Sequence, residues 1–451
     1  MLKNARKGFY SDLFTLVFPI VIQNLISSSV SLADVLMLGQ VNQTVLSASS
    51  LAGQVQFLLN TVFFGLASAI TILAAQYWGK NDRKTISRIF GMGLIVSLLF
   101  TVPAALLTLL VPRAVIRIWT NVPELIDAGA VYLRTVSLSY LFAGIAEPYL
   151  SVMKSCERVK LSTAVSAATL GLNVLLNAVL IFGLFGFPAM GIRGATLATA
   201  ISRAAEVLIS AVDFLHQRIM PRNPGTIFSI PRSLVRDFMR FSLPAFINDA
   251  MWGLAFNMNS IIMGHLGADI VAANSIVTVV RDLVTTVGFG ISGASSILLG
   301  KELGEGKLAL ARSDASSILK TGLLTSIGQG LLLLTLIPVV PHFVKLSDTA
   351  SGYLRIMLLI NTVYQIGIIL NTLLIASIFR CGGESRYGMM LDIICMWCFA
   401  VPLGLISAFV LKLPPLIVYL LMCTDEFAKL PFAIHHYKRG KWLRNLTRDY
   451  E

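Results

Sequence analysis

An aspartate lies inside the first apolar stretch of the chain, where a charged side chain is costly. The stretch runs from about Leu13 to Gly39, and Asp34, in "SLADVLMLGQ", is its one charged residue. On insertion scales, an aspartate at the centre of a membrane helix costs roughly 2.5 to 3.5 kcal/mol, and less near an interface. No basic residue stands at helical spacing from Asp34. This carboxylate therefore needs a partner elsewhere in the chain or a functional role.

Polar residues from two later apolar stretches are expected at the depth of Asp34. Asn173 and Asn177 are four residues apart, and Thr196 and Thr199 are three apart, so each pair lies on one face of its helix. At 1.5 Å per residue, Asp34 lies about 8 Å and Asn177 about 10 Å from the outer end of its helix. A carboxylate, amide oxygens and a hydroxyl form a site that suits Na⁺, or a buried acid that binds a proton. The alternative is a static hydrogen-bond network.

The composition indicates which elements position these residues. The chain has 451 residues, of which 56% are hydrophobic and 13% charged, and its mean hydropathy is +0.78. These values exclude a soluble globular protein. Twelve apolar stretches are long enough to cross a hydrocarbon core of ~30 Å as helices. They cover residues 13–39, 46–78, 85–111, 129–153, 160–184, 191–216, 236–264, 268–299, 312–340, 350–378, 386–410 and 413–437. We therefore predict an all-α integral membrane protein with twelve transmembrane helices.

The two halves of the sequence repeat. Residues 18–79 align without gaps with residues 243–304, and the alignment pairs Pro19 with Pro244. Shared Pro and Gly positions indicate a shared backbone conformation, which a common hydrophobic composition alone would not produce. Because six is even, both six-helix halves enter the membrane in the same sense, which predicts parallel-repeat lobes around a central cleft, as in alternating-access transporters. The predicted domains are an N-terminal lobe (1–216), a cytoplasmic linker (217–235) and a C-terminal lobe with a cytoplasmic tail (236–451).

The repeat places one acid in each half, at exchanged positions. Asp34 aligns with Asn259, and Asn24 aligns with Asp249. An acid in the seventh stretch is expected to need the same explanation as Asp34. We therefore predict a second-lobe site, for coupling or for substrate, at Asp249 and Asn259.

The other charges inside the apolar stretches have structural explanations. Opposite charges three or four residues apart can neutralise one another, as in Arg203 with Glu206 and Lys429 with Asp425 or Glu426. Arg281 and Asp282 are adjacent and do not share a helix face, so each is expected to find a partner on another helix. Asp392 lies near a helix end and is expected to be solvated.

The distribution of basic residues predicts the orientation. The segments "GKNDRKTISR" and "KSCERVK" are rich in Lys and Arg, whereas the alternate loops "GQVNQTV" and "GHLGAD" hold neither. By the positive-inside rule, both termini face the cytoplasm. Basic loops facing anionic lipid account for the net charge of +13 without nucleic acid. The five cysteines lie in helices or cytoplasmic loops and imply no disulfide framework.

Several motifs resemble those of one transporter family. They are "SLADVLMLGQ" followed by "LSASSLAGQVQFLLNTVFFGLASAITILAAQYWGK", then "GLNVLLNAVLIFG", "GIRGATLATAISR" and the repeated "MGHLGADIVAANSI". In their order, and with the repeat, they resemble the multidrug and toxic compound extrusion (MATE) transporters over nearly the whole chain. "NDAMWG" and "TDEFAK" look like a bacterial, DinF-like branch of that family.

The resemblance implies an antiporter coupled to H⁺ or Na⁺ that exports organic cations and amphipathic drugs by alternating access. It assigns cation coupling to Asp34, Asn173, Asn177 and Thr199, with Na⁺ suited to the first three. Some family members carry a second acid where Asn177 stands, and the missing charge weakens the case for Na⁺ and leaves proton coupling open. The coupling ion is the only cofactor expected. Membrane lipids and small molecules are the expected partners of a monomer.

The sequence argues against two other functions. A flippase for lipid-linked saccharides or cell-wall precursors would need a cationic cavity for diphosphate, whereas the unpaired buried charges in this sequence are acidic. An intramembrane enzyme lacks support, because no H-E-x-x-H, G-x-S-x-G or paired catalytic aspartate occurs within the apolar stretches. We therefore predict a transporter and not an enzyme.

Overall fold

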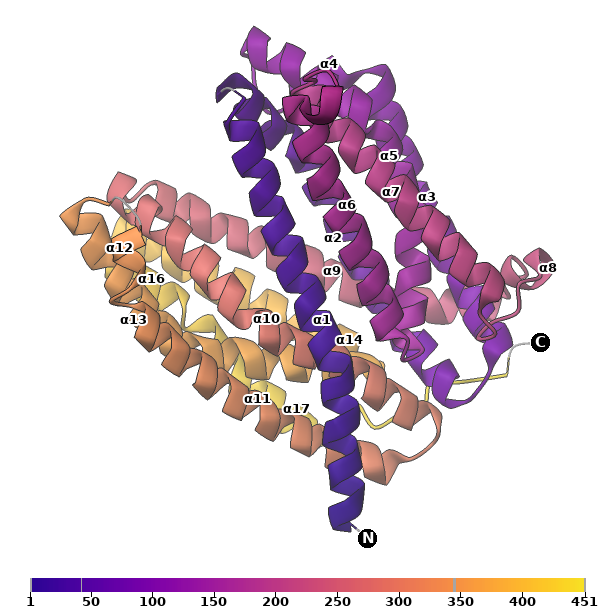
Figure 1. Ribbon diagram of the computed structural model, residues 1–451. Coiled ribbons are helices and arrows are strands. Elements are labelled where there is room, and N and C mark those ends of the chain that lie inside the picture. Colours follow the sequence, from indigo (N-terminus) through magenta and orange to yellow (C-terminus); the bar gives the residue numbers. More distant parts are fainter. Residues whose placement is uncertain (1, 42, 344–345, 450–451) are drawn as a thin grey trace. The chain divides into compact units, whose positions relative to one another are not determined.

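Helices account for nearly all of the chain in the computed structural model, which describes residues 2–41, 43–343 and 346–449 (Figure 1). These residues form helices and no β-strand. An apolar segment in lipid must satisfy its backbone hydrogen bonds internally, and a helix does so within one segment. The predicted all-α class is confirmed.

Within the described residues, twelve helical segments occupy the twelve predicted stretches (Figure 1). They are α1 (Leu2–Gly39), α2 (Gln43–Gly79), α3 (Arg83–Leu110), α5 (Pro123–Ser155), α6 (Val159–Phe182), α7 (Ile192–His216), α9 (Arg232–Gly264), α10 (Ala268–Gly304), α11 (Leu308–Leu336), α13 (Asp348–Asn371) with the π-helix η2 (Thr372–Phe379), α14 (Ser385–Ile393) with η3 (Ile394–Ala400), α15 (Val401–Leu405) and η4 (Ile406–Val410), and α16 (Pro415–Met422) with α17 (Asp425–Lys438). The short helices between them are α4 (Pro112–Ile116), η1 (Leu184–Gly186), α8 (Pro224–Ile227) and α12 (Val340–Phe343).

Ten helices of the described chain are long and apolar enough to cross a membrane. The other two segments are α9 and the α16–α17 pair. Helix α9 carries Asp249 and three asparagines among its apolar residues after Arg240, and the last segment is interrupted between Met422 and Asp425. Polar residues in one case and a break in the other explain why these two lack a long apolar window.

The helices form two compact units. The N-terminal unit comprises residues 22–236 together with Asp449, and the C-terminal unit comprises residues 2–21 and 237–448. This division differs from the predicted lobes at the start of the chain, because the first part of α1 packs on α10. A Cβ at Gly290 would lie only 2.5 Å from Cγ2 of Val21. Since α1 is one helix of 38 residues, it belongs to both units.

In the N-terminal unit, α5 packs against α2, α3 and α7, and α6 packs on α7. Apolar side chains that include Leu59, Leu133 and Tyr140 form the core between α2 and α5. The third helix approaches α5 closely at Gly144, where a Cβ would lie 2.4 Å from Oγ1 of Thr101. These contacts hold α5 and α7 as the base on which α6 lies.

In the C-terminal unit, α10, α11 and α13 pack pairwise, and α17 packs on α13, α14 and η3. Asn371 ends α13 and donates Nδ2 to the carbonyl oxygen of Glu426 at 2.7 Å, which joins α13 to α17. The π-helix η2 begins at the next residue. π-Helical segments are rare and occur frequently at functional sites.

The segment 217–235, predicted as a linker, is packed on the N-terminal unit. Oγ of Ser87 donates to the carbonyl oxygen of Pro221 at 2.9 Å, and Ile227 of α8 is buried. A Cβ at Gly91 would lie 2.2 Å from the carbonyl oxygen of Ile227, so only glycine allows α8 to approach α3 this closely. The segment therefore packs on α3 of the N-terminal unit and contains a short helix of its own.

Candidate functional site

The hairpin between α6 and α7 builds one wall of the candidate site. Helix α6 ends at Phe182, and Gly183 follows with a φ of 73°, a left-handed conformation that glycine adopts without strain. The chain then returns, and the amide of Met190 donates to the carbonyl oxygen of Leu180 at 2.9 Å. A Cβ at Gly194, in the first turn of α7, would lie 2.5 Å from that same oxygen. Glycine at 194 therefore lets α7 lie directly against α6.

Four of the predicted site residues form one hydrogen-bond chain. Nδ2 of Asn177 donates to Oδ1 of Asp34 at 2.5 Å and to Oδ1 of Asn173 at 3.2 Å. Nδ2 of Asn173 in turn donates to Oγ1 of Thr199 at 3.4 Å, and Thr199 donates to the carbonyl oxygen of Ala195 at 3.0 Å. The structure thus brings together Asp34 of α1, the two asparagines of α6 and Thr199 of α7.

Apolar packing fixes α1 beside this chain of hydrogen bonds. Leu38, one turn beyond Asp34, packs with Ile181 of α6 and Ala195 of α7 in one buried cluster. Three turns before Asp34, Nε2 of Gln23 donates to Oγ of Ser166 at 2.7 Å. The carboxylate is therefore held between two α1–α6 contacts, one on each side.

The charge of Asp34 has no cationic partner within ion-pair distance among the described residues. Its side chain is half-buried, whereas Asn177 is 1% exposed and Oδ1 of Asn177 has no hydrogen-bond partner. Tyr132 of α5 lies near enough for its phenol to interact electrostatically with the carboxylate. The sequence prediction missed Tyr132, although the repeat of "YLR" at 132–134 and 353–355 could have drawn attention to it.

This arrangement can bind one positive charge. A carboxylate that lacks an ion pair but accepts a hydrogen bond from an amide can take up a proton or a monovalent cation. The hydrogen bonds run from α1 through α6 to α7, so a change of charge at Asp34 alters contacts among three helices. Thr196 does not take part, because its hydroxyl donates to the carbonyl oxygens of Ile192 and Arg193.

The predicted second-lobe pair is not brought together. Asp249 forms a bidentate ion pair with Arg380, with Oδ1 to Nη2 at 2.5 Å and Oδ2 to Nη1 at 3.1 Å. Asn259 lies ten residues further along α9, which corresponds to about 15 Å along the helix axis. The repeat alignment suggested a common site because it does not report partners such as Arg380, which comes from a different helical segment. Asp249 is a paired acid, unlike Asp34.

Most of the remaining charges pair as predicted. Nη1 of Arg203 lies 2.6 Å from Oε2 of Glu206 and 3.5 Å from Oε1 of Glu147. Arg281 has the predicted partner on another helix, because it lies over the ring of Phe256 on α9. The expectation for Asp282 was wrong, since it contacts its neighbour Arg281 at 3.3 Å, a long side chain that reaches around the helix. The expectation for Asp392 was also wrong. Asp392 is 7% exposed and accepts a hydrogen bond from Lys429, so it is buried and not solvated.

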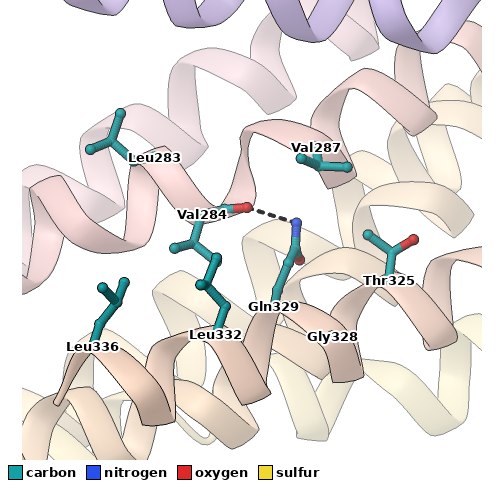
Figure 2. Close-up of a pocket in the computed structure, with 8 residues that line it drawn as sticks. All are labelled: Leu283, Val284, Val287, Thr325, Gly328, Gln329, Leu332 and Leu336. Carbon is teal, nitrogen blue, oxygen red and sulfur yellow. Dashed lines mark hydrogen bonds between the residues drawn. The ribbon is translucent and has the colours of Figure 1, made fainter.

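A groove of 530 Å³ lies between α10 and α11 in the C-terminal unit (Figure 2). Its lining consists of Leu283, Val284, Val287, Thr325, Gly328, Gln329, Leu332 and Leu336. The amide of Gln329 points towards α10 and donates Nε2 to the carbonyl oxygen of Val284 at 2.7 Å (Figure 2). Because none of these lining side chains is charged, the groove lacks the chemistry of a cation site.

The two halves of the chain match one family model. Residues 19–179 and 244–406 both match the model described as MatE. The chain belongs to the MatE family. Proteins of this family are membrane transporters, so the predicted MATE resemblance and the absence of enzymatic function are confirmed, and the chain is a multi-pass membrane protein.

Curated relatives match nearly the full length. An uncharacterized transporter, YisQ, from Bacillus subtilis is 21% identical over 98% of this chain and 96% of its own length. The probable multidrug resistance protein NorM from Thermotoga maritima is 23% identical over 97% of this chain and 94% of its own. The probable multidrug resistance protein YoeA from Bacillus subtilis is 22% identical over 98% of this chain and 96% of its own.

Solved structures share the fold. A MATE protein in the bent conformation has a TM-score of 0.86 at 17% identity, covering 96% of both chains. A MATE structure in the straight conformation has a TM-score of 0.85 at 18% identity, covering 95% of this chain and 94% of that chain. A MOP superfamily transporter from Pyrococcus furiosus also gives 0.86 at 17% identity over 96% of both chains. At these identities the likeness concerns the fold.

Proposed function

We propose that this chain is a cation-coupled antiporter that exports organic cations and amphipathic drugs by alternating access, with Asp34 as the coupling residue. The observation that carries the proposal is the chain of hydrogen bonds from Asp34 through Asn177 and Asn173 to Thr199, which begins at a carboxylate without an ion pair. The names of two relatives, both probable multidrug resistance proteins, support drugs as the substrate class.

The orientation of Asn177 favours H⁺ over Na⁺ as the coupling ion. Na⁺ binds oxygen ligands, yet Asn177 directs its amide nitrogen at both Asp34 and Asn173. To ligate Na⁺ together with Asp34, the carboxamide of Asn177 would have to turn over and lose both hydrogen bonds. A proton needs only one oxygen of Asp34. No cofactor other than the coupling ion enters the proposal.

Coupling follows from the change in hydrogen-bond strength. Bonds to a charged acceptor contribute about 1.5 to 3 kcal/mol, and neutral ones about 0.5 to 1.5 kcal/mol. Protonation of Asp34 therefore weakens the tie between α1 and α6 by about 1 kcal/mol or more. Allosteric coupling free energies are typically of this size, about 1 to 3 kcal/mol. Because α1 belongs to both units, a change in its attachment to α6 acts on the helix that the units share.

The proposed setting is the plasma membrane of a bacterium, with both termini in the cytoplasm. The support is the concentration of Lys and Arg in alternate loops. In this orientation the proton gradient points inwards, and proton entry through Asp34 would drive substrate outwards. A DinF-like branch assignment stays a prediction from "NDAMWG" and "TDEFAK".

The test is transport by purified protein in sealed proteoliposomes. A fluorescent lipophilic cation is loaded, and its movement is followed under an imposed proton gradient, and separately under an imposed Na⁺ gradient. Asp34→Asn keeps the shape and the hydrogen-bond acceptor but cannot titrate, so gradient-driven movement should be lost. Asp12→Asn is the matched control, because Asp12 lies on the same helix and is exposed.

The outcomes separate the alternatives. Loss of transport in Asp34→Asn, with normal rates in Asp12→Asn, supports the proposal. Asp34→Asn that transports at the unmutated rate would show that the aspartate is only structural. Transfer of a lipid-linked saccharide across the bilayer without any movement of the cation would favour the flippase instead.

A further inference from the structure

The C-terminal unit contains a second group of buried charges, centred on Lys429 of α17. Its Nζ lies 2.7 Å from Oε1 of Glu426, 3.2 Å from Oδ1 of Asp392 and 3.6 Å from Oδ2 of Asp425. Lys429 is 1% exposed, and the three acids are 3 to 7% exposed. These four residues are called the Lys429 cluster.

The charges of the Lys429 cluster do not balance. Three ionised carboxylates around one ammonium leave two negative charges without compensation. In real proteins the penalty for burying an ion is several kcal/mol, which a single lysine cannot offset for three partners. All three acids can therefore be ionised together only if something else supplies positive charge.

Two buried asparagines indicate where that charge is held. Nδ2 of Asn248 donates to Oδ2 of Asp392 at 2.9 Å, and Nδ2 of Asn371 donates to Oε2 of Glu426 at 2.7 Å. Both side chains thus point into the cluster, and they are only 4% and 3% exposed. The Oδ1 atom of each has no hydrogen-bond partner. A buried acceptor without a donor costs about 1 to 3 kcal/mol. If either amide turned over, its Oδ1 would face the carboxyl group and could accept a hydrogen bond from it once that group is protonated.

The position of the lysine argues against a metal ion as the missing charge. Nζ of Lys429 already lies among all three carboxylates, where a cation would bind, and an ammonium repels a second cation. Among the described residues, no group of three or more His, Cys, Asp or Glu side chains is arranged to hold a metal ion. A proton on one of the carboxyl groups removes one negative charge from the cluster. The protonated carboxyl group is also a hydrogen-bond donor.

The surrounding groups do not supply the charge. Those that face the cluster are Tyr364 of α13, whose hydroxyl donates to Oδ1 of Asp425 at 3.0 Å, Cys395 of η3, Cys423 at the end of α16, Arg281 of α10, and the pair of Asp249 with Arg380. Both guanidinium groups have their own carboxylates, since Arg380 is held by Asp249 and Arg281 contacts Asp282. The tyrosine and cysteines add no positive charge.

We propose that the Lys429 cluster binds at least one exchangeable proton, shared among the carboxyl groups of Asp392, Asp425 and Glu426. It is a proton site in the C-terminal unit, in addition to Asp34 in the N-terminal unit. The proton bridges α14 and α17, and its release would leave α17 in a strongly negative environment. Only its use in transport rests on the proposed function, since binding at this cluster requires neither Asp34 nor a substrate.

Infrared spectroscopy tests the proposal directly. The full-length chain carrying Asp34→Asn is reconstituted in lipid nanodiscs at neutral pH, and the C=O absorption of protonated carboxylic acids is measured in H₂O and D₂O. Adding Asp425→Asn and Glu426→Gln leaves Asp392 and Lys429 as a balanced pair. This variant should lose the absorption of at least one carboxylic acid per molecule relative to its parent. Glu124→Gln is the control, because Glu124 is exposed and should leave the absorption unchanged.

A second measurement covers the case in which the double substitution does not fold. Unfolding releases a proton that the folded cluster binds, so stability should fall as the pH rises from about 4, where exposed carboxyl groups titrate, until the cluster loses its proton. Glu426→Gln preserves the side-chain shape and removes one titrating group, and its thermal stability should depend less on pH than that of the parent. An unchanged carboxylic-acid absorption in the folded double variant would overturn the proposal. Parallel stability curves for Glu426→Gln and its parent would also overturn it. Because both measurements are made with Asp34 substituted, they do not depend on the proposed function. A failure of proton-driven export by the unmutated chain would count against the proposed function alone.

Discussion

Substitution of Gly194 by alanine is expected to separate α7 from α6 and to break the hydrogen-bond chain of the candidate site. A Cβ at this position would lie 2.5 Å from the carbonyl oxygen of Leu180 and 2.6 Å from its carbonyl carbon, and ordinary contact begins at 3.4 Å. Because these are backbone atoms of a helix, they cannot rotate away. The two helices must therefore move apart by about 0.9 Å, the difference between these contact distances.

The hydrogen bond between Asn173 and Thr199 cannot absorb this movement. Its length is already 3.4 Å, and a rigid displacement of about 0.9 Å would extend it to about 4.3 Å, beyond any hydrogen bond. Overpacking costs about 1 to 3 kcal/mol, and the lost hydrogen bond costs about 0.5 to 1.5 kcal/mol. Together they give a destabilisation of about 1.5 to 4.5 kcal/mol. For a unit of this size, each kcal/mol lowers the Tm by about 2 to 4 °C.

Gly171 provides a matched control on the same hairpin. It lies in the middle of α6, and a Cβ there would meet no atom within 4 Å. Alanine in an open helical position is favoured over glycine by about 1 kcal/mol, so Gly171→Ala should raise the Tm slightly. The two variants make the same chemical change, and opposite shifts are expected because only Gly194 has a backbone neighbour.

The assay combines thermal unfolding in detergent with cation movement in proteoliposomes. Gly194→Ala should lower the Tm by several degrees and reduce gradient-driven transport, whereas Gly171→Ala should leave transport unchanged. Equal Tm values and equal transport rates in the two variants would refute the close α6–α7 approach and its role in holding Thr199.

Three further outcomes are expected. Asn177→Asp adds a second carboxylate beside Asp34, so transport should become more dependent on Na⁺; a variant that still responds only to the proton gradient would contradict this. Burial raises the pKa of the Cys156 thiol to about 12, so at pH 9 only about one thousandth of it is thiolate. Maleimide labelling of the folded protein should therefore be far slower than labelling after denaturation. Equal labelling rates would show that the thiol is accessible in the folded protein. A cysteine placed in the loop "GQVNQTV" should react with an impermeant reagent from outside intact cells, and one placed between Pro221 and Pro231 should not; labelling of the second site would reverse the proposed orientation.

The sequence alone determined the helical architecture and the residues of the candidate site. Long apolar stretches in lipid have one way to satisfy their backbone groups, so the helices follow from composition and length. The depth of Asp34, Asn177 and Asn173 follows from a fixed rise per residue, and the i, i+4 spacing puts both asparagines on one face. These periodicities are local properties, which is why they could be predicted before any contact was known.

The tertiary structure alone decided which charged groups on different helical segments are partners. The repeat alignment gives each half one acid, Asp34 and Asp249, but Arg380 pairs with Asp249 whereas Asp34 has only an amide donor. Asp392 looked solvated from its place near a helix end, yet α17 covers it and directs Lys429 at it. The sequence reports spacing along one helix, whereas ion pairs between distant segments depend on how helices rotate and pack. The direction in which Asn177 presents its amide is likewise set by its neighbours on α1 and α6, and no pattern in the sequence predicts it.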